Sequence, residues 1–164
     1  MIYTDEELTL LIGCPKRISQ APRREMRVEG QMLRNEMELE ALDGKHSFRI
    51  FMRQSRLFAE NFSVGIDYLP RDEPGSFCLL RCNGMHGGHK VHPHHLNCHI
   101  HRSKAEELNA GLRVERHIEP TTQYAAFRDA LRYFLLLVNV QVTDLSQYFP
   151  GITQPDMFER EIEP

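Results

Sequence analysis

The sequence predicts an α+β fold, a mostly antiparallel β-meander of about five or six strands with a long C-terminal amphipathic helix packed on one face. Three observations predict this fold. Apolar and polar residues alternate with a period of two from Leu33 onward, apolar residues recur at helical spacing between Tyr124 and Val138, and the strands precede the helix. At 164 residues, with 41% apolar and 26% charged side chains, the chain has the size and composition of one globular domain.

The N-terminal part predicts a short helix followed by a connector. Thr4 and Glu7 form a capping box in front of a helix over residues 5–12, and Gly13 is expected to end that helix in a left-handed conformation. Residues 13–30 contain two prolines and a cluster of basic side chains, Lys16, Arg17, Arg23, Arg24 and Arg27. We therefore expect a basic connector here, before a meander over residues 33–102.

The first two strands of the meander predict a β-hairpin with a defined register. Apolar and acidic residues alternate up to Ala41, Asp43-Gly44 is typical of a tight turn with two positive φ values, and residues 45–53 form the partner strand. Counting outward from the turn gives three expected pairs, Leu39 with Phe48, Met37 with Ile50 and Glu38 with Arg49. Both faces of the hairpin agree on this register.

Further strands are expected over residues 62–68, 77–82 and 97–102, with one more within 112–118. The helical part covers residues 103–149. It begins with a capping box of Ser103 and Glu106, and a helix over about 123–138 is capped by Thr122 and buries Phe127, Leu131 and Phe134. Residues 150–164 are an acidic tail, expected to dock on the domain, on a second copy in a homodimer or on a partner.

The loop over residues 83–98 and the strand after it are rich in histidine. Seven of the nine histidines and two of the four cysteines lie between Cys82 and His101. On a strand His99 and His101 point to the same face, while Cys98 and Ile100 point to the core. We therefore expect both histidines on an open surface near Arg81, and the glycines upstream allow His86 or His89 to fold back over that surface.

Three interpretations of this histidine-rich segment stay open. In the first, His99 and His101 are an acid–base pair that cleaves RNA without a metal, with Arg81 stabilising the phosphorane and His86 and His89 as further catalytic candidates. His92, His94 and His95 are then dispensable. In the second, Cys82, His86, His94 and Cys98 bind zinc. In the third, the segment is an inert solvated loop and the protein has no cofactor.

Charge and hydropathy restrict the location and the partners. A net charge of −3 does not indicate a nucleic-acid binder, although the basic stretches 16–27 and 45–56 are suited to contact phosphates. The longest apolar run, residues 134–138, is too short to span a bilayer, and the N-terminus lacks the basic residues of a signal peptide. We expect a cytoplasmic protein with no membrane partner, whose cysteines are thiols or metal ligands.

Four segments carry a resemblance to known families: "LLRCNGMHGGH", "HIHRS", "EPTTQY" and "ALRYFLLLVNV". Over roughly residues 33–140 the chain resembles a family of small uncharacterised bacterial proteins with an Arg-x-Asn-Gly segment, a following histidine and a His-x-His strand. It is also distantly similar to TumE-type toxins. Carried over by position, the resemblance selects Arg81, Asn83, His86, His89, His99 and His101. The toxin similarity implies an RNA-directed role.

The sequence thus predicts a nucleic-acid-directed, ribonuclease-like protein of a bacterial toxin–antitoxin or phage-defence system, with RNA and an antitoxin-like or other protein as partners. Two alternatives remain. One is a non-catalytic, zinc-stabilised binding module, and the other is a protein-interaction domain in which the histidines have no chemical role.

Overall fold

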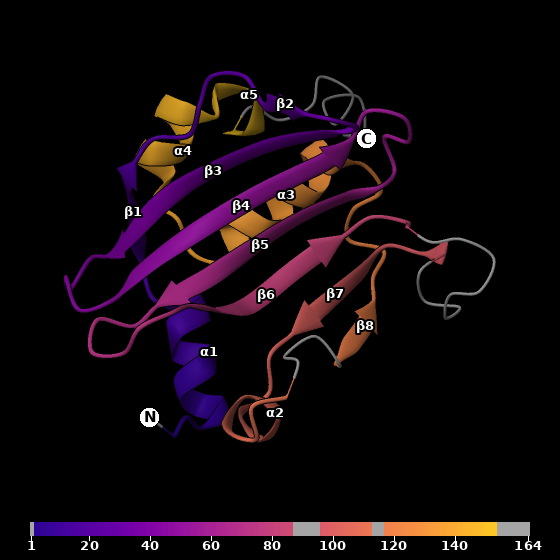
Figure 1. Cartoon of the computed structure of the whole chain (residues 1–164). Coiled ribbons are helices and arrows are strands. Elements are labelled where there is room, and N and C mark those ends of the chain that lie inside the picture. Colours follow the sequence, from indigo (N-terminus) through magenta and orange to yellow (C-terminus); the bar gives the residue numbers. More distant parts are fainter. Residues whose placement is uncertain (1, 87–95, 113–116, 154–164) are drawn as a thin grey trace, which may run out of the picture.

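The computed structural model describes residues 2–86, 96–112 and 117–153. The strands within these residues form one eight-stranded antiparallel sheet in the order β1-β3-β4-β5-β6-β7-β8, with β2 paired to β3 (Figure 1). The elements, in chain order, are α1 (Asp5–Gly13), β1 (Lys16–Gln20), β2 (Arg27–Glu29), β3 (Met32–Ala41), β4 (Ser47–Ser55), β5 (Phe62–Leu69), β6 (Phe77–Asn83), β7 (His99–Arg102), α2 (Ala105–Asn109), β8 (Ile118–Pro120), α3 (Phe127–Leu137), α4 (Val142–Tyr148) and α5 (Pro150–Thr153).

The α+β class and the antiparallel sheet are confirmed, but the predicted number of strands is too low. Residues 13–30 are not only a connector, because β1 and β2 lie within them and both pair with β3. In β1 the pattern of apolar residues is weak, with Ile18 as its one apolar side chain. Its pairing therefore depends on the available edge of β3, which lies more than ten residues further along the chain.

The predicted hairpin is confirmed with its register. Leu39 lies opposite Phe48, Met37 opposite Ile50 and Glu38 opposite Arg49. The turn differs in one detail, since Gly44 has a φ of 70° and Asp43 does not have a positive φ. The Gly44 N–H donates to the Ala41 carbonyl at 2.9 Å, and a single left-handed residue is enough to close this four-residue connection.

The C-terminal helix is shorter than predicted. Instead of one long helix over about 123–138, α3 has 11 residues and is followed by the short helices α4 and α5. Thr122 does not cap it, because the N-cap is Ala126, without a side-chain hydrogen bond. The chain leaves the helix through Asn139, which has a φ of 60°. The expected burial is found for Leu131 and Phe134, while Phe127 is half-buried.

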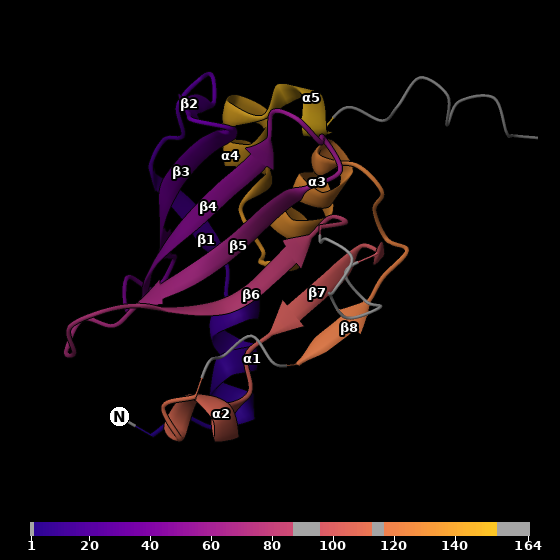
Figure 2. The same ribbon diagram turned by 45° about the vertical axis from the view of Figure 1, so that its right-hand side comes forward.

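The helix α3 covers one face of the sheet, and it lies behind the strands in Figure 1 and beside them in Figure 2. The core lies between this face and the helices. The largest buried side chains of the sheet include Phe48, Ile50, Phe62, Ile66 and Leu80, each at most 1% exposed. The other face of the sheet has no helix of the described residues on it, and this asymmetry decides where polar side chains gather.

The helix α1 has the predicted capping box, in which Glu7 N–H donates to the Thr4 hydroxyl and Thr4 N–H donates to the Glu7 carboxylate. Gly13 does not have the predicted left-handed conformation; it belongs to the helix, and Cys14 is the C-cap. The carbonyls at this end bind Lys16 instead. Its fully buried ammonium donates to Ile12 O at 2.7 Å, Cys14 O at 2.8 Å and Val138 O at 3.0 Å.

The second predicted capping box is wrong. The N-cap of α2 is Lys104 and makes no side-chain cap hydrogen bond. Ser103 donates its hydroxyl to the Cys78 carbonyl on β6, which ties the end of β7 to its neighbour. Gly111, with a φ of 65°, follows the helix as expected. None of the described helices is long and apolar enough to cross a membrane.

Candidate functional site on the outer face of the sheet

The sheet face opposite α3, which we call the outer face, carries a pattern of polar residues aligned across the strands. Side chains alternate between faces along each strand, so cross-strand partners share a face. The outer face consists mainly of two rows, the first Arg34, Arg53, Ser63, Asn83 and His99, and the second Glu36, Phe51, Gly65, Arg81 and His101. The row between them, Met52, Val64, Cys82 and Ile100, points toward α3.

At one end of the first row Asn83, His86 and His99 form a compact group, which we call the polar triangle. The Nε2 atoms of His86 and His99 are 3.3 Å apart. The Nδ2 atom of Asn83 lies 3.3 Å from the His99 Nε2 and 3.4 Å from the His86 Nε2. Three nitrogen atoms from three positions of the chain therefore converge with nearly equal spacing.

The protonation of His99 follows from its contacts. Its Nδ1 lies 2.8 Å from the Asn97 carbonyl oxygen, and a carbonyl only accepts, so Nδ1 carries a proton. In the neutral ring the Nε2 atom is then an acceptor, and it faces the Nε2 of His86.

The prediction that His99 and His101 lie on an open surface is wrong. His99 is 0% exposed and His101 is 7% exposed. The shared face is confirmed, since the two rings meet edge-on with centroids 5.0 Å apart, and the His86 ring lies 5.0 Å from His99 on another side. Pairing with β8 makes β7 an inner strand of the sheet, so its side chains have neighbours on both flanks.

Arg81 lies in the second row, two residues before Asn83 on β6. It is half-buried, and its Cα partner across β7 is His101. A guanidinium group beside an imidazole is suited to bind a phosphate, because it remains charged at every physiological pH. The structure thus places Arg81, His86, His99 and His101 close together, while His89 lies outside the described residues.

Of the predicted zinc ligands, Cys82 and His86 lie on opposite faces of the sheet. Cys82 is fully buried on the α3 side of the sheet, where burial raises the pKa of its thiol to about 12. His86 lies on the opposite face with His99. Cys98 is half-buried against the core, and burial raises the pKa of its thiol as well. His94 is outside the described residues, which contain no group of three or more His, Cys, Asp or Glu side chains suited to a metal.

Tyr124 supports the triangle from the other side of the sheet, and the sequence did not indicate this role. Its buried hydroxyl lies 2.9 Å from the His99 carbonyl oxygen and 3.2 Å from the Asn83 carbonyl oxygen. Burial raises the pKa of Tyr124, so the hydroxyl stays protonated as a donor. The "EPTTQY" segment contains this tyrosine, but nothing in its spacing identifies the two carbonyls as its partners.

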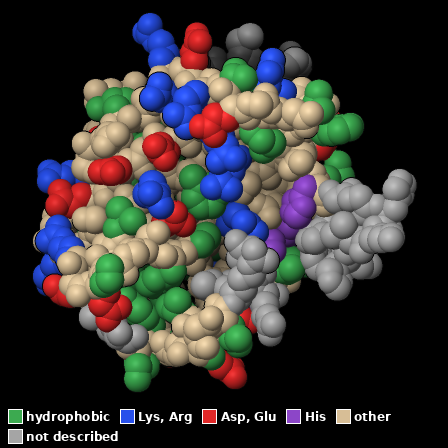
Figure 3. Space-filling model, in the orientation of Figure 1, with side chains coloured by type: hydrophobic (Ala, Val, Ile, Leu, Met, Phe, Trp, Pro, Cys, Tyr) green, Lys and Arg blue, Asp and Glu red, His purple; other side chains and the backbone are tan. Residues whose placement is uncertain are grey.

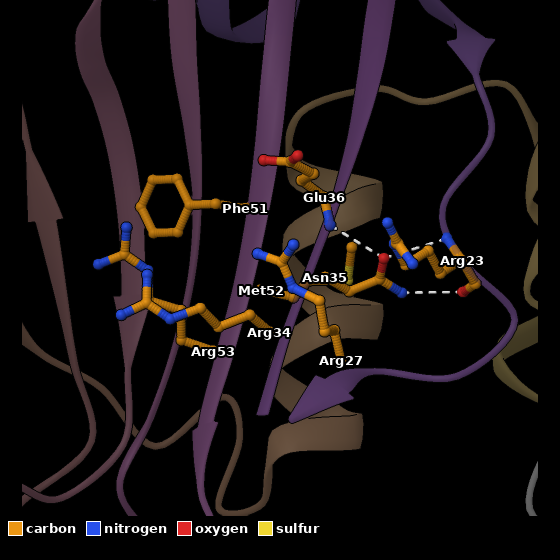
Figure 4. A pocket seen from close by; sticks show the side chains of 8 residues that line it. All are labelled: Arg23, Arg27, Arg34, Asn35, Glu36, Phe51, Met52 and Arg53. Atoms are coloured by element: carbon orange, nitrogen blue, oxygen red, sulfur yellow. Dashed lines mark hydrogen bonds between the residues drawn. The ribbon is translucent and has the colours of Figure 1, made fainter. Parts of the chain in front are cut away.

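A second feature of the outer face is a hollow at the far end of the rows, over β3 and β4. It is lined by Arg23, Arg27, Arg34, Asn35, Glu36, Phe51, Met52 and Arg53, and we call it the arginine hollow (Figure 4). The two basic stretches of the sequence meet here, since Arg23 and Arg27 come from the first and Arg53 from the second. Four arginines and one glutamate give the hollow a positive charge despite the net charge of −3.

The side chains in the arginine hollow differ in how they are paired. Arg27 and Arg34 both contact Glu29, the latter at 2.9 Å. The guanidinium carbon of Arg53 lies 4.9 Å above the centre of the Phe51 ring. That ring lies across Gly65, where an added Cβ atom would be 2.4 Å from the Phe51 Cζ. Gly65 therefore allows the ring to lie flat against the sheet.

In Figure 3 the outer face carries a band of Lys and Arg side chains that ends beside the histidines. The strand order gives the distance between Arg53 and His99. From Arg53 to His99 there are three strand-to-strand steps, which amount to about 14 Å. An arginine-rich hollow and a histidine cluster thus occupy the two ends of one surface, with Phe51, Ser63, Gly65 and Arg81 between them.

The chain matches no protein-family model, and no curated protein or solved structure shows significant similarity to it. The resemblance described above therefore rests on the quoted residues.

Proposed function

We propose that this protein binds single-stranded RNA on the outer face and cleaves it at the histidines. The observation that carries the proposal is the alignment of the arginine hollow with the histidines along two cross-strand rows. A span of about 14 Å between Arg53 and His99 suits a polymeric anion rather than a single phosphate. The Arg53 guanidinium stacked over the Phe51 ring offers a base a stacking surface, because bases stack on arginine planes as well as on aromatic rings.

The cleavage reaction needs a base, an acid and a cation. The 2′-oxygen attacks the adjacent phosphorus while its proton passes to an unprotonated nitrogen of the His86–His99 pair. The bond from phosphorus to the 5′-oxygen then breaks, and the imidazolium of His101 protonates the leaving oxygen. Arg81 stabilises the negative charge of the phosphorane. The products are a 2′,3′-cyclic phosphate and a free 5′-hydroxyl.

Cleavage of an end-labelled single-stranded RNA tests this proposal. We expect His99→Gln and His101→Gln to reduce the rate at least about 100-fold, the usual contribution of a general acid or base. His117→Gln is the matched control, because His117 is exposed and pairs with Glu119 at 2.9 Å. The rate is also expected to rise and fall between about pH 5 and 8, since one ring must be neutral and another charged.

DNA of the same sequence is expected to stay intact, because it lacks the attacking 2′-hydroxyl. Two results would refute the proposal: wild-type protein that leaves RNA uncut, or folded His99→Gln and His101→Gln variants that cut at the wild-type rate. Binding without cleavage would instead favour the binding module. A toxin–antitoxin or phage-defence setting, with an antitoxin-like partner, stays a prediction that co-purification can test.

A further inference from the structure

We infer that the polar triangle of Asn83, His86 and His99 is a binding site for a divalent transition-metal ion. The three atoms that converge are 3.3, 3.3 and 3.4 Å apart. These residues differ from the Cys–His set that the sequence indicated, because they share only His86 with it. The site stands on the geometry of the cluster and does not depend on RNA cleavage.

The spacing is that of ligands around one ion. Imidazole nitrogen and amide or carboxylate oxygen bind zinc at about 2.0–2.2 Å. Two ligand atoms at a tetrahedral angle around such an ion are about 3.3–3.4 Å apart by simple trigonometry. An ion at this distance from all three atoms would lie slightly outside their plane. The three side chains therefore need almost no rearrangement to bind it.

The proton on His99 supports the same conclusion. Its Nδ1–H donates to the Asn97 carbonyl at 2.8 Å, so in the neutral ring the nitrogen that faces the triangle carries the lone pair. Metal-binding histidines almost always hold their second nitrogen in such a hydrogen bond, because it fixes the ring and raises the basicity of the ligand atom. Here a backbone carbonyl two residues away fills that role.

Asn83 provides the third observation. Its side chain is 2% exposed, and its Oδ1 atom has no hydrogen-bond partner among the described residues. A half-turn of the amide exchanges the oxygen and nitrogen positions at little cost in shape. It would direct Oδ1 into the triangle as a ligand. A buried amide oxygen without a donor is costly, and an ion would remove that cost.

The surrounding fold holds the ligands in place. Asn83 and His99 are Cα partners on β6 and β7, and the Tyr124 hydroxyl contacts the carbonyl oxygens of both. His86 follows β6 in irregular chain, and its ring lies against His99 on the same face. Two of the three ligands thus come from paired strands, and ligands on such rigid elements favour tight binding.

The two imidazole ligands suit zinc and its neighbours in the first transition series rather than magnesium or calcium. Three protein ligands leave at least one position open, as in catalytic rather than structural zinc sites. If RNA is cleaved as proposed above, an ion held by His86 and His99 would supply a bound hydroxide as the base in place of a nitrogen of that pair, and the hydroxide would become water on accepting the 2′-hydroxyl proton. This last statement alone rests on the proposed function.

Titration of the chelator-treated protein with zinc, followed by calorimetry and elemental analysis, tests the site. We expect about one tightly bound equivalent and a rise in melting temperature on binding. Because loop histidines also bind zinc weakly, the variants decide the result. His86→Ala and His99→Gln should weaken the tight binding at least about 100-fold, since each removes a direct ligand. His117→Gln and Cys82→Ala should retain it.

Asn83→Asp covers the case in which a histidine variant fails to fold. A carboxylate of the same size adds a negative charge to the site, so zinc should bind at least as tightly as in the wild type. The inference is overturned if no equivalent binds tightly, or if folded His86→Ala and His99→Gln bind as the wild type does. If the protein binds zinc tightly but leaves RNA uncut, only the proposed function is refuted. If the metal-free protein cleaves RNA, only the role of the metal site in cleavage is refuted.

Discussion

Cys82 and Asn83 are neighbours in the chain, yet they serve different parts of the molecule. The thiol of Cys82 lies in the core on the α3 side, while the amide of Asn83 joins His86 and His99 on the outer face. The alternation of a β-strand separates them, since successive side chains point to opposite faces. On β6, Cys82 thus contributes to the core, and the next residue, Asn83, belongs to the candidate site.

The buried thiol predicts how stability depends on pH. Burial raises the pKa of Cys82 from 9.0 to about 12, so the folded protein keeps this proton at pH values where the unfolded chain loses it. Stability from this group is complete below pH 9 and is lost as the pH rises toward 12, on the order of 4 kcal/mol in total. The raised pKa of buried Tyr124 acts in the same direction.

Urea denaturation at pH 8, 9, 10 and 11 measures this effect. The free energy of unfolding of the wild type should fall over this range, and Cys82→Ala should flatten the decline although its stability at pH 8 is lower. Cys14→Ala is the control, because Cys14 is also a free thiol but is less buried. Equal slopes for wild type and Cys82→Ala would contradict the assignment.

At the scale of elements, the end of β6 and the turn after it position the histidines. Gly84 is buried, and its N–H donates to the Phe62 carbonyl at 3.0 Å, which keeps the turn close to β5. A Cβ atom at this position would lie 2.0 Å from the Glu60 carbonyl oxygen and 2.5 Å from the Phe62 ring. The close approach of the two segments therefore requires a glycine.

Replacement of this glycine should disturb both the fold and the site. We expect Gly84→Ala to lower the free energy of unfolding by about 3 kcal/mol, at the upper end for overpacking, because backbone lies nearest to the new methyl group. The comparison is Gly13→Ala in α1, where no atom lies within 4 Å of the added Cβ. That change should be neutral or stabilising by up to about 1 kcal/mol. Similar effects of the two substitutions would show that the turn is looser than described.

At the scale of the whole molecule, positive charge is concentrated on one part of the surface although the net charge is negative. The chain has a net charge of −3, yet the arginine hollow brings together Arg27 and Arg53, which lie more than twenty positions apart in the sequence. Acidic residues balance other parts of the same face, as Glu40 does for Arg17 and Arg71. An anionic polymer would therefore meet a local positive surface on an acidic protein.

The proposed RNA surface predicts a definite dependence on salt. Binding of a 2′-O-methyl oligoribonucleotide, which cannot be cleaved, should weaken with salt with a log–log slope of about −2 to −3 for four arginines. Arg53→Gln should weaken binding and bring the slope about 0.7 closer to zero, because one phosphate contact is lost. Phe51→Leu should weaken binding about fivefold or more without changing the slope, since the ring carries no charge.

Fluorescence anisotropy with a labelled oligonucleotide measures both quantities. Arg17→Gln is the matched control, because Arg17 is exposed and lies on the same sheet at the other end of β3, paired with Glu40. It should bind as the wild type does. Wild-type affinity and slope in Arg53→Gln and Phe51→Leu, or tighter binding of a duplex, would argue against a single-strand surface here.

Local signals in the sequence determined several features of this protein. The hairpin of β3 and β4 has its predicted register, because the turn and both alternating faces require the same pairing. The capping box of α1 involves residues three positions apart. The shared face of His99 and His101 follows from the period of a strand, whichever strand lies beside it. Interactions between near neighbours in the chain specify each of these features.

The remaining features were decided by tertiary structure, because they depend on segments distant in the sequence. The pairing of β7 with β6 and β8 buries His99 and places it opposite Asn83. No local sequence pattern predicts this burial. The contact with His99 places His86 on the outer face, away from Cys82 in the core, so these two predicted zinc ligands are not brought together. Lys16 is buried because carbonyls from two helix ends, more than 100 residues apart, meet at its ammonium group. Spacing along the chain restricts only near neighbours, whereas a binding site is assembled by the packing of elements that the chain brings together last.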